Sequence, residues 1–154
     1  ISRLSHIKRV LCSDYDYGAT DVLFINQLDS QKTSPSNNLV VCNFDFMLDY
    51  REHLYPERAT RIKSECLVAL AVTHHLMLTQ KYSLDVILSI MSDYTSKYLI
   101  IEFMPLGLWD GLSAPNLPKW YSKEFFENMI LTKYKIIDSS FIEENRIIYF
   151  CEMI

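Results

Sequence analysis

Glycine is scarce in this sequence, at 3 of 154 residues. At the usual frequency of about 7%, a chain of this length would contain roughly eleven glycines. Glycine lets the backbone approach a phosphate or a nucleotide closely, because it has no Cβ. The deficit therefore argues against a glycine-rich nucleotide loop within these residues. The first residue is Ile rather than Met, and we expect a processed or truncated chain.

Basic charge and long apolar runs are also missing. Lys and Arg number 15 against 19 Asp and Glu, which gives a net charge of −4. No basic stripe is present, so we expect no nucleic-acid partner. No apolar run reaches the length of about 18 residues that a membrane span needs, and no signal-peptide pattern opens the chain. We expect no membrane partner, although a leader that has been removed stays open.

Cysteine is sparse and unclustered. Cys12, Cys42, Cys66 and Cys151 are widely spaced, and no two of them form a CxxC pair. Each lies in or beside an apolar run, which favours buried free thiols over disulfides or a zinc site. We therefore expect no metal site and a reducing, cytoplasmic setting.

The residues that are present suit a compact α/β protein. The hydrophobic fraction is 49%, which fits one globular domain over residues 1–154. Apolar runs that predict strands alternate with longer patterns at helical spacing. We expect strands over residues 7–13, 39–42, 66–72, 98–103, 134–137 and 146–151, and helices over residues 19–28, 57–64, 83–96 and 122–131. This alternation predicts an open, mostly parallel sheet, and a tight turn at residues 143–145 makes the last two strands an antiparallel hairpin.

Polar side chains follow or interrupt several of the predicted strands. They are Asp14 after the first strand, Asn43 and Asp45 after the second, His74 and His75 after the third, and Glu102 inside the fourth. Ligands of open α/β sheets bind outside the carboxyl ends of the strands, so we expect these groups to line one edge. An acidic residue at such a position can accept two hydrogen bonds from ribose hydroxyls.

At these residues the sequence resembles the class I S-adenosylmethionine-dependent methyltransferases, and more narrowly a bacterial group of nodulation-type and glycan-modifying enzymes. The resemblance is carried by LVALAVTHHL (67–76), YLIIEFMPLG (98–107), WYSKEFFENMI (120–130) and NRIIYFCEM (145–153). VLCSDYD (10–16) and LVVCNFDFM (39–47) resemble the second and third strands of that fold. The resemblance implies a Rossmann-like fold, S-adenosylmethionine as cofactor, and methyl transfer to a small-molecule or glycan-like acceptor.

The resemblance also implies which residues bind the cofactor. Asp14 resembles the acidic residue that holds the ribose, and Asn43 or Asp45 resembles the polar residue that meets the adenine. Ala71 and Thr73 belong to the motif that lines the methionine end. A solvated carboxylate at a strand end is the structural alternative for Asp14.

Catalytic and acceptor-binding roles follow in the same way. His74 or His75 would be the base that takes the acceptor proton, and the adjacent pair is not expected to bind a metal, because neighbouring side chains on a strand point opposite ways. Trp109 and Tyr121 lie where such enzymes place substrate loops. Glu102 is a candidate substrate contact, but a carboxylate inside an apolar strand needs a partner, so a structural ion pair is open for it as well.

The sequence departs from the family in one large respect. The first strand of that fold, which lies in the centre of the sheet, and the GxGxG loop after it should precede residue 7, and the chain does not contain them. The chain is then a fragment of a longer enzyme, or another chain supplies the strand, or the sheet closes differently; we expect a fragment. The alternative function is a non-catalytic methyltransferase-like domain in protein–protein assembly, with a partner chain or a second copy covering the open sheet edge.

Overall fold

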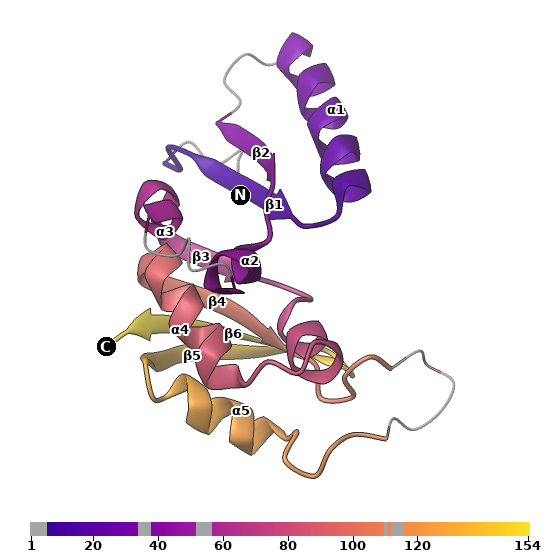
Figure 1. Cartoon of the computed structure of the whole chain (residues 1–154), viewed down its shortest axis with the longest axis vertical. Coiled ribbons are helices and arrows are strands. Elements are labelled where there is room, and N and C mark those ends of the chain that lie inside the picture. The colour runs from indigo at the N-terminus through magenta and orange to yellow at the C-terminus, as the bar shows by residue number, and fades with distance from the viewer. Residues whose placement is uncertain (1–5, 34–37, 52–56, 110, 112–115) are drawn as a thin grey trace. The chain divides into compact units, whose positions relative to one another are not determined.

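The chain forms two compact units, Ile1–Asp49 and Tyr50–Ile154, in the computed structural model (Figure 1). The structure describes residues 6–33, 38–51, 57–109, 111 and 116–154. The expectation of one domain over residues 1–154 stays a prediction. No helix in these described ranges combines the length and the apolar character that crossing a membrane requires.

The first unit contains a parallel pair of strands joined by a helix. Strand β1 (Val10–Asp14) leads into helix α1 (Tyr17–Thr33), and strand β2 (Leu39–Asn43) follows. The two strands pair in parallel with Asp14 opposite Asn43, so their carboxyl ends meet at one edge (Figure 1). A parallel pair needs a long crossover of this kind, because a tight hairpin can join only antiparallel strands. Helix α2 (Phe46–Arg51) begins directly after β2.

The second unit is built on a four-stranded sheet in the order β3-β4-β6-β5. Its elements are α3 (Glu57–Ile62), β3 (Ser64–Ala69), the π-helix η1 (His75–Thr79), α4 (Leu84–Tyr94), β4 (Thr95–Phe103), α5 (Lys123–Ile130), β5 (Tyr134–Glu143) and β6 (Arg146–Met153). Strands β3 and β4 are parallel, and β6 pairs antiparallel with both β4 and β5. The predicted α/β fold with a parallel sheet and an antiparallel carboxyl-terminal hairpin is therefore confirmed.

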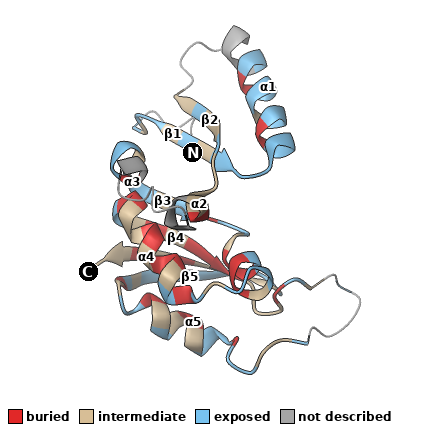
Figure 2. Cartoon of the chain, in the orientation of Figure 1, coloured by how far each residue is buried: buried red, intermediate tan, exposed pale blue. Residues whose placement is uncertain are grey.

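The core of the second unit lies between this sheet and its helices (Figure 2). Alternate residues of β4, such as Leu99 and Ile101, are fully buried, which is the period of two expected for a strand with one face in a core. Helix α4 buries Ile87 and Leu88, and Phe126 of α5 packs its ring 4.7 Å from that of Phe103. These side chains pack the helices against the sheet.

The structure corrects several expected boundaries. Strand β3 ends at Ala69 rather than at residue 72, because Ala71 takes a left-handed conformation with φ of 55°. Helix α1 covers residues 17–33 rather than 19–28, and α2 and the π-helix are additional elements. Both sheets also have open edges: among the described residues, β1 and β2 pair only with each other, β3 pairs only with β4, and β5 pairs only with β6.

The cysteines are all free thiols, but they are not all buried. Cys151 is buried, Cys12 and Cys42 are partly buried, and Cys66 is exposed. The expectation of a buried thiol is wrong for Cys66, because β3 is an edge strand of the sheet. A run of apolar residues predicts a strand but does not place it at the centre or at the edge.

Candidate functional site

In the first unit, three polar residues gather where β1 and β2 end. Asn43 donates from Nδ2 to the backbone oxygens of Asp14 at 3.1 Å and of Tyr15 at 3.0 Å, which ties the two strand ends together. The Asp14 carboxylate is exposed, and its Oδ1 accepts the backbone N–H of Asp16 at 3.0 Å. Asp45 accepts the backbone N–H of Met47 at 2.9 Å and so caps α2. Asp14 is thus an oriented carboxylate that faces solvent.

In the second unit, the chain makes a strained turn between β3 and η1. Ala71 has φ of 55°, a region that costs a residue with a Cβ about 1–3 kcal/mol, so surrounding contacts must hold it there. The hydroxyl of Thr73 donates to the backbone oxygen of Glu102 at 2.7 Å, and Thr73 is buried. The backbone N–H of Leu76 donates to the oxygen of Val72 at 3.1 Å, which starts the helical turn.

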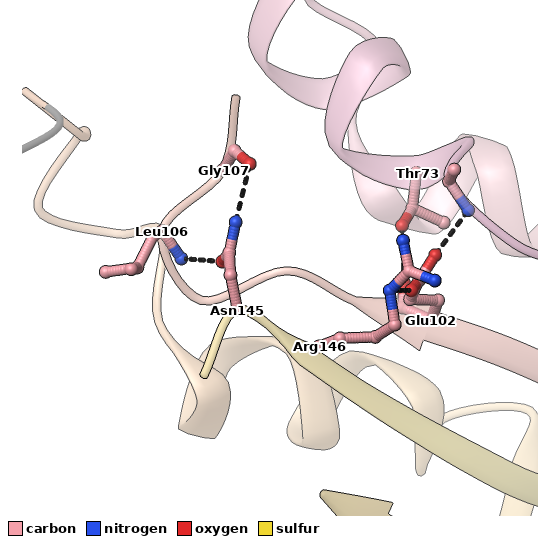
Figure 3. A network of polar contacts seen from close by, with 7 residues as sticks. Thr73, Glu102, Leu106, Gly107, Asn145 and Arg146 are labelled. Carbon is pink, nitrogen blue, oxygen red and sulfur yellow. Dashed lines mark hydrogen bonds and ion pairs between the residues drawn. The ribbon is translucent and has the colours of Figure 1, made fainter. Parts of the chain in front are cut away.

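Glu102 lies beside this turn as a buried carboxylate (Figure 3). Its side chain is 1% exposed. Oε2 accepts the backbone N–H of Ala71, and Nε of Arg146 lies 2.7 Å from Oε1. The second contact is an ion pair without the alignment of a hydrogen bond, so Oε1 accepts none within the described part of the chain. These contacts favour the structural pairing of Glu102; a substrate contact stays a prediction.

His74 and His75 lie in different surroundings although they are neighbours in sequence. The ring of His74 is 4% exposed, and its Nδ1 has no hydrogen-bond partner within the described residues. The pKa of His74 is lowered to about 4, chiefly by burial and in smaller part by the nearby His75 and Arg146. His75 is exposed, with its ring centroid 4.3 Å from that of His74. His74 is therefore a neutral ring at neutral pH, and His75 is the imidazole that solvent reaches.

The loop after β4 is anchored at its base. Asn145 accepts the backbone N–H of Leu106 at 2.5 Å through Oδ1 and donates to the oxygen of Gly107 at 3.2 Å through Nδ2 (Figure 3). Tyr121 is buried, its hydroxyl donates to the oxygen of Met104 at 2.9 Å, and burial raises its pKa. Trp109, further along this loop, is partly exposed.

The structure thus brings some of the expected residues together and adds others. Asp14, Asn43 and Asp45 meet at one end of the first sheet, and in the second unit Glu102 contacts the turn that holds Ala71, Thr73 and His74. The sequence alone assigned no role to Arg146 or Asn145, although both contact this region. The signal for a cation was present, because a carboxylate in an apolar strand needs a partner charge, but its identity depends on the pairing of β4 with β6.

Among the side chains that the structure describes, no group of three or more His, Cys, Asp and Glu residues could hold a metal ion.

Comparisons with known proteins place this arrangement in a fold. No protein-family model and no curated protein matches the sequence. Among solved structures, the 16S rRNA methylase ArmA matches 95% of this chain at 17% identity with a TM-score of 0.58. Magnesium protoporphyrin IX methyltransferase (ChlM) from Synechocystis PCC 6803 with bound SAH matches 95% at 14% identity with a TM-score of 0.63, and WbdD matches 92% at 13% identity with a TM-score of 0.57.

The likeness establishes the fold. The chain shares the Rossmann-like α/β fold of these structures, at identities that show the fold alone. It spans less than two thirds of the length of these structures: 62% of ArmA, 64% of ChlM and 30% of WbdD.

Proposed function

We propose that this chain is part of a methyltransferase that moves the methyl group of S-adenosylmethionine to a small-molecule or glycan-like acceptor. The observation that carries the proposal is the structural likeness to two methyltransferases, one of them with bound SAH. The narrower assignment, to a bacterial nodulation-type or glycan-modifying group, rests on the resemblance of the sequence alone, and the cytoplasmic setting rests on the unclustered cysteines.

The residues of the first unit suit the nucleoside end of such a cofactor. The exposed Asp14 carboxylate, oriented by the N–H of Asp16, would accept hydrogen bonds from the two ribose hydroxyls. Asn43 already uses Nδ2 for two backbone oxygens, so only its Oδ1 would meet the adenine. Asp45 is committed to the cap of α2 through Oδ1, which makes it the weaker of the two candidates.

The residues of the second unit suit the reacting end. S-adenosylmethionine would supply a methyl group bonded to a sulfonium sulfur; an acceptor nucleophile would attack that methyl carbon in line, with S-adenosylhomocysteine as the leaving group. The protein's part is to align the two and to take the acceptor proton. Of the two histidines we assign the base to His75, because His74 is buried and its lowered pKa makes it a weak base. Ala71 and Thr73 would line the methionine end, and Trp109 and Tyr121 the acceptor side.

A second candidate function is a non-catalytic domain that assembles with a partner chain. The observation that favours it is the open edge of β3, which has no strand beside it other than β4 in the described ranges. An unpaired edge can accept a strand from another chain or from a second copy. The sequence also contains no GxGxG loop for the cofactor.

Calorimetry with S-adenosylhomocysteine separates the two functions. The 154-residue chain and a chain extended at its N-terminus are titrated side by side. We expect the extended chain to bind, and Asp14→Ala to weaken its binding by about 10- to 100-fold, as for the loss of hydrogen bonds to a charged group. Asp21→Ala, an exposed carboxylate on α1, is the matched control and leaves binding unchanged.

Each outcome has a clear consequence. An extended chain that binds no S-adenosylhomocysteine contradicts the methyltransferase proposal and leaves the assembly function. A 154-residue chain that binds at micromolar affinity contradicts the argument that the glycine loop is needed for the cofactor.

A further inference from the structure

We propose that Glu102 is a positioning residue that fixes the turn between β3 and η1 and thereby the place of His75. The role of His75 in methyl transfer rests on the proposed function, whereas the bracing of the turn does not. Glu102 touches the turn at two points and a cation at a third, and no other carboxylate among the described residues does this.

The first contact follows from the unequal ends of two paired strands. The pairing of β3 with β4 stops at Ala69 opposite Ile101, while β4 continues to Phe103. Glu102 is therefore the first residue of β4 that lies beyond its pairing with β3. The backbone N–H of Ala71 has no strand to donate to at this point, and the Glu102 carboxylate accepts it through Oε2. The carboxylate thereby supplies a hydrogen-bond acceptor to a backbone N–H that has left the strand ladder.

The second contact comes from the other side of the turn. The Thr73 hydroxyl donates to the backbone oxygen of Glu102 at 2.7 Å, so the side chain and the main chain of one residue hold positions 71 and 73. Ala71 itself takes the left-handed conformation, with φ of 55°. These contacts fix the strained residue and the residue two positions after it, close to the start of the π-helix.

Arg146 completes the arrangement by pairing with the same carboxylate. A carboxylate that is 1% exposed needs a partner charge, and Nε of Arg146 lies 2.7 Å from Oε1. The two oxygens thus have separate partners: Oε1 faces the cation and Oε2 faces the turn (Figure 3). Arg146 is the first residue of β6 and directly follows the tight turn that joins β5 to β6. The β5–β6 hairpin therefore also supports the turn between β3 and η1.

The consequence for the site is the different exposure of the two histidines. His74 follows Thr73 and is buried, while His75 is exposed at the first position of η1. Leu76 and Met77 are buried and anchor the next positions in the core. A turn held at residues 71 and 73 and anchored again at residue 76 leaves His75 little freedom to move. Loss of the Glu102 carboxylate would release the first of these points.

The test compares matched carboxylate variants of the full chain by NMR. Glu102→Ala and Glu102→Gln are set against Glu127→Ala and Glu127→Gln. Glu127 is a suitable control because it also accepts a hydrogen bond, from Tyr149 at 3.0 Å, and pairs with Lys123 at 3.5 Å, but it lies on α5. The measured quantities are the exchange rate of the Ala71 amide and the ring signals of His75.

We expect Glu102→Ala to accelerate exchange of the Ala71 amide by about 10- to 100-fold, as for the loss of a hydrogen bond to a charged acceptor. Glu102→Gln still offers an oxygen and is expected to show a smaller acceleration, and both variants should shift the His75 ring signals. The Glu127 variants should leave both signals as in the wild type. Unchanged Ala71 exchange in Glu102→Ala, or equal changes in the Glu127 variants, would overturn the proposal; Glu102→Gln decides it if the alanine variant does not fold.

A kinetic measurement on an active, extended chain tests the link to catalysis. Glu102→Ala should lower kcat by about 10- to 100-fold through misplacement of the base, with the KM for the methyl donor within about twofold of the wild type. An unchanged kcat together with a shifted His75 signal would refute the positioning role. A wild type that binds no S-adenosylhomocysteine would refute the proposed function instead, and the NMR comparison would still decide whether Glu102 braces the turn.

Discussion

Burial of the neutral His74 ring makes the stability of the second unit depend on pH. Its pKa in the folded chain is lowered from 6.5 to about 4, chiefly by burial. Because the folded pKa lies below the unfolded one, the unfolded chain takes up a proton first as the pH falls. The contribution of His74 is therefore complete above the unfolded pKa of 6.5 and is lost as the pH falls toward about 4.

The size of this effect follows from the difference between the two pKa values. At 1.36 kcal/mol for each tenfold change in proton affinity, the difference corresponds to about 3 kcal/mol. Carboxylates also titrate over part of this range, so the wild type alone does not isolate the histidine. The useful quantity is the difference between the wild type and a variant without the imidazole, measured at each pH.

Urea unfolding of the wild type and His74→Gln, between about pH 7.5 and about pH 4, measures that difference. The fluorescence of Trp109 and Trp120 reports the transition, because both belong to the second unit. We expect the wild type to lose about 3 kcal/mol more than His74→Gln over this range. Leu88→Ala is the control: it removes a fully buried side chain and should cost about 2–5 kcal/mol at every pH. Parallel pH curves for the wild type and His74→Gln would refute the reasoning.

Three further predictions concern the packing around the site. Gly107→Ala should destabilise the chain by more than about 1 kcal/mol, because the new Cβ would lie 2.7 and 2.9 Å from side-chain atoms, whereas Gly111→Ala, with positive φ but open space, should cost less in the same urea assay. Asn145→Ala should cost about 1–3 kcal/mol through the loss of two hydrogen bonds to the loop after β4, and a melting temperature equal to that of the wild type would contradict this. A thiol reagent should modify the exposed Cys66 in the native chain and spare Cys151, whose pKa burial raises to about 12, until the chain unfolds; equal rates for the two thiols would show that β6 is not buried.

The alternation of strands and helices could be predicted because it depends on the spacing of apolar residues within short stretches of sequence. Alternating or continuous apolar residues marked the strands, and Leu84, Ile87, Leu88 and Met91 marked helix α4 at helical spacing. The same local pattern placed Asp14 and Asn43 at strand ends, where the structure has them, whereas His74 lies at the start of the π-helix, beyond the turn that follows β3. Their roles toward a cofactor and an acceptor stay predictions.

The contacts that build the turn at Ala71 were not predictable in the same way. They depend on residues about 30 positions or more apart in sequence that meet only through strand pairing, such as Ala71 with Glu102 and Glu102 with Arg146. The positive φ of Ala71 could not be predicted from the sequence, because alanine favours the right-handed helical conformation.

The amino-acid sequence alone was enough to predict the fold class and the succession of the six strands along the chain. It also placed polar residues after strands. These features depend on neighbours within a few residues. Only the tertiary structure decided that Glu102 pairs with Arg146, that His74 is buried while His75 is exposed, and that Cys66 lies on an edge strand. Strand order and register decide which side chains leave water, and they come from long-range pairing that no local pattern encodes.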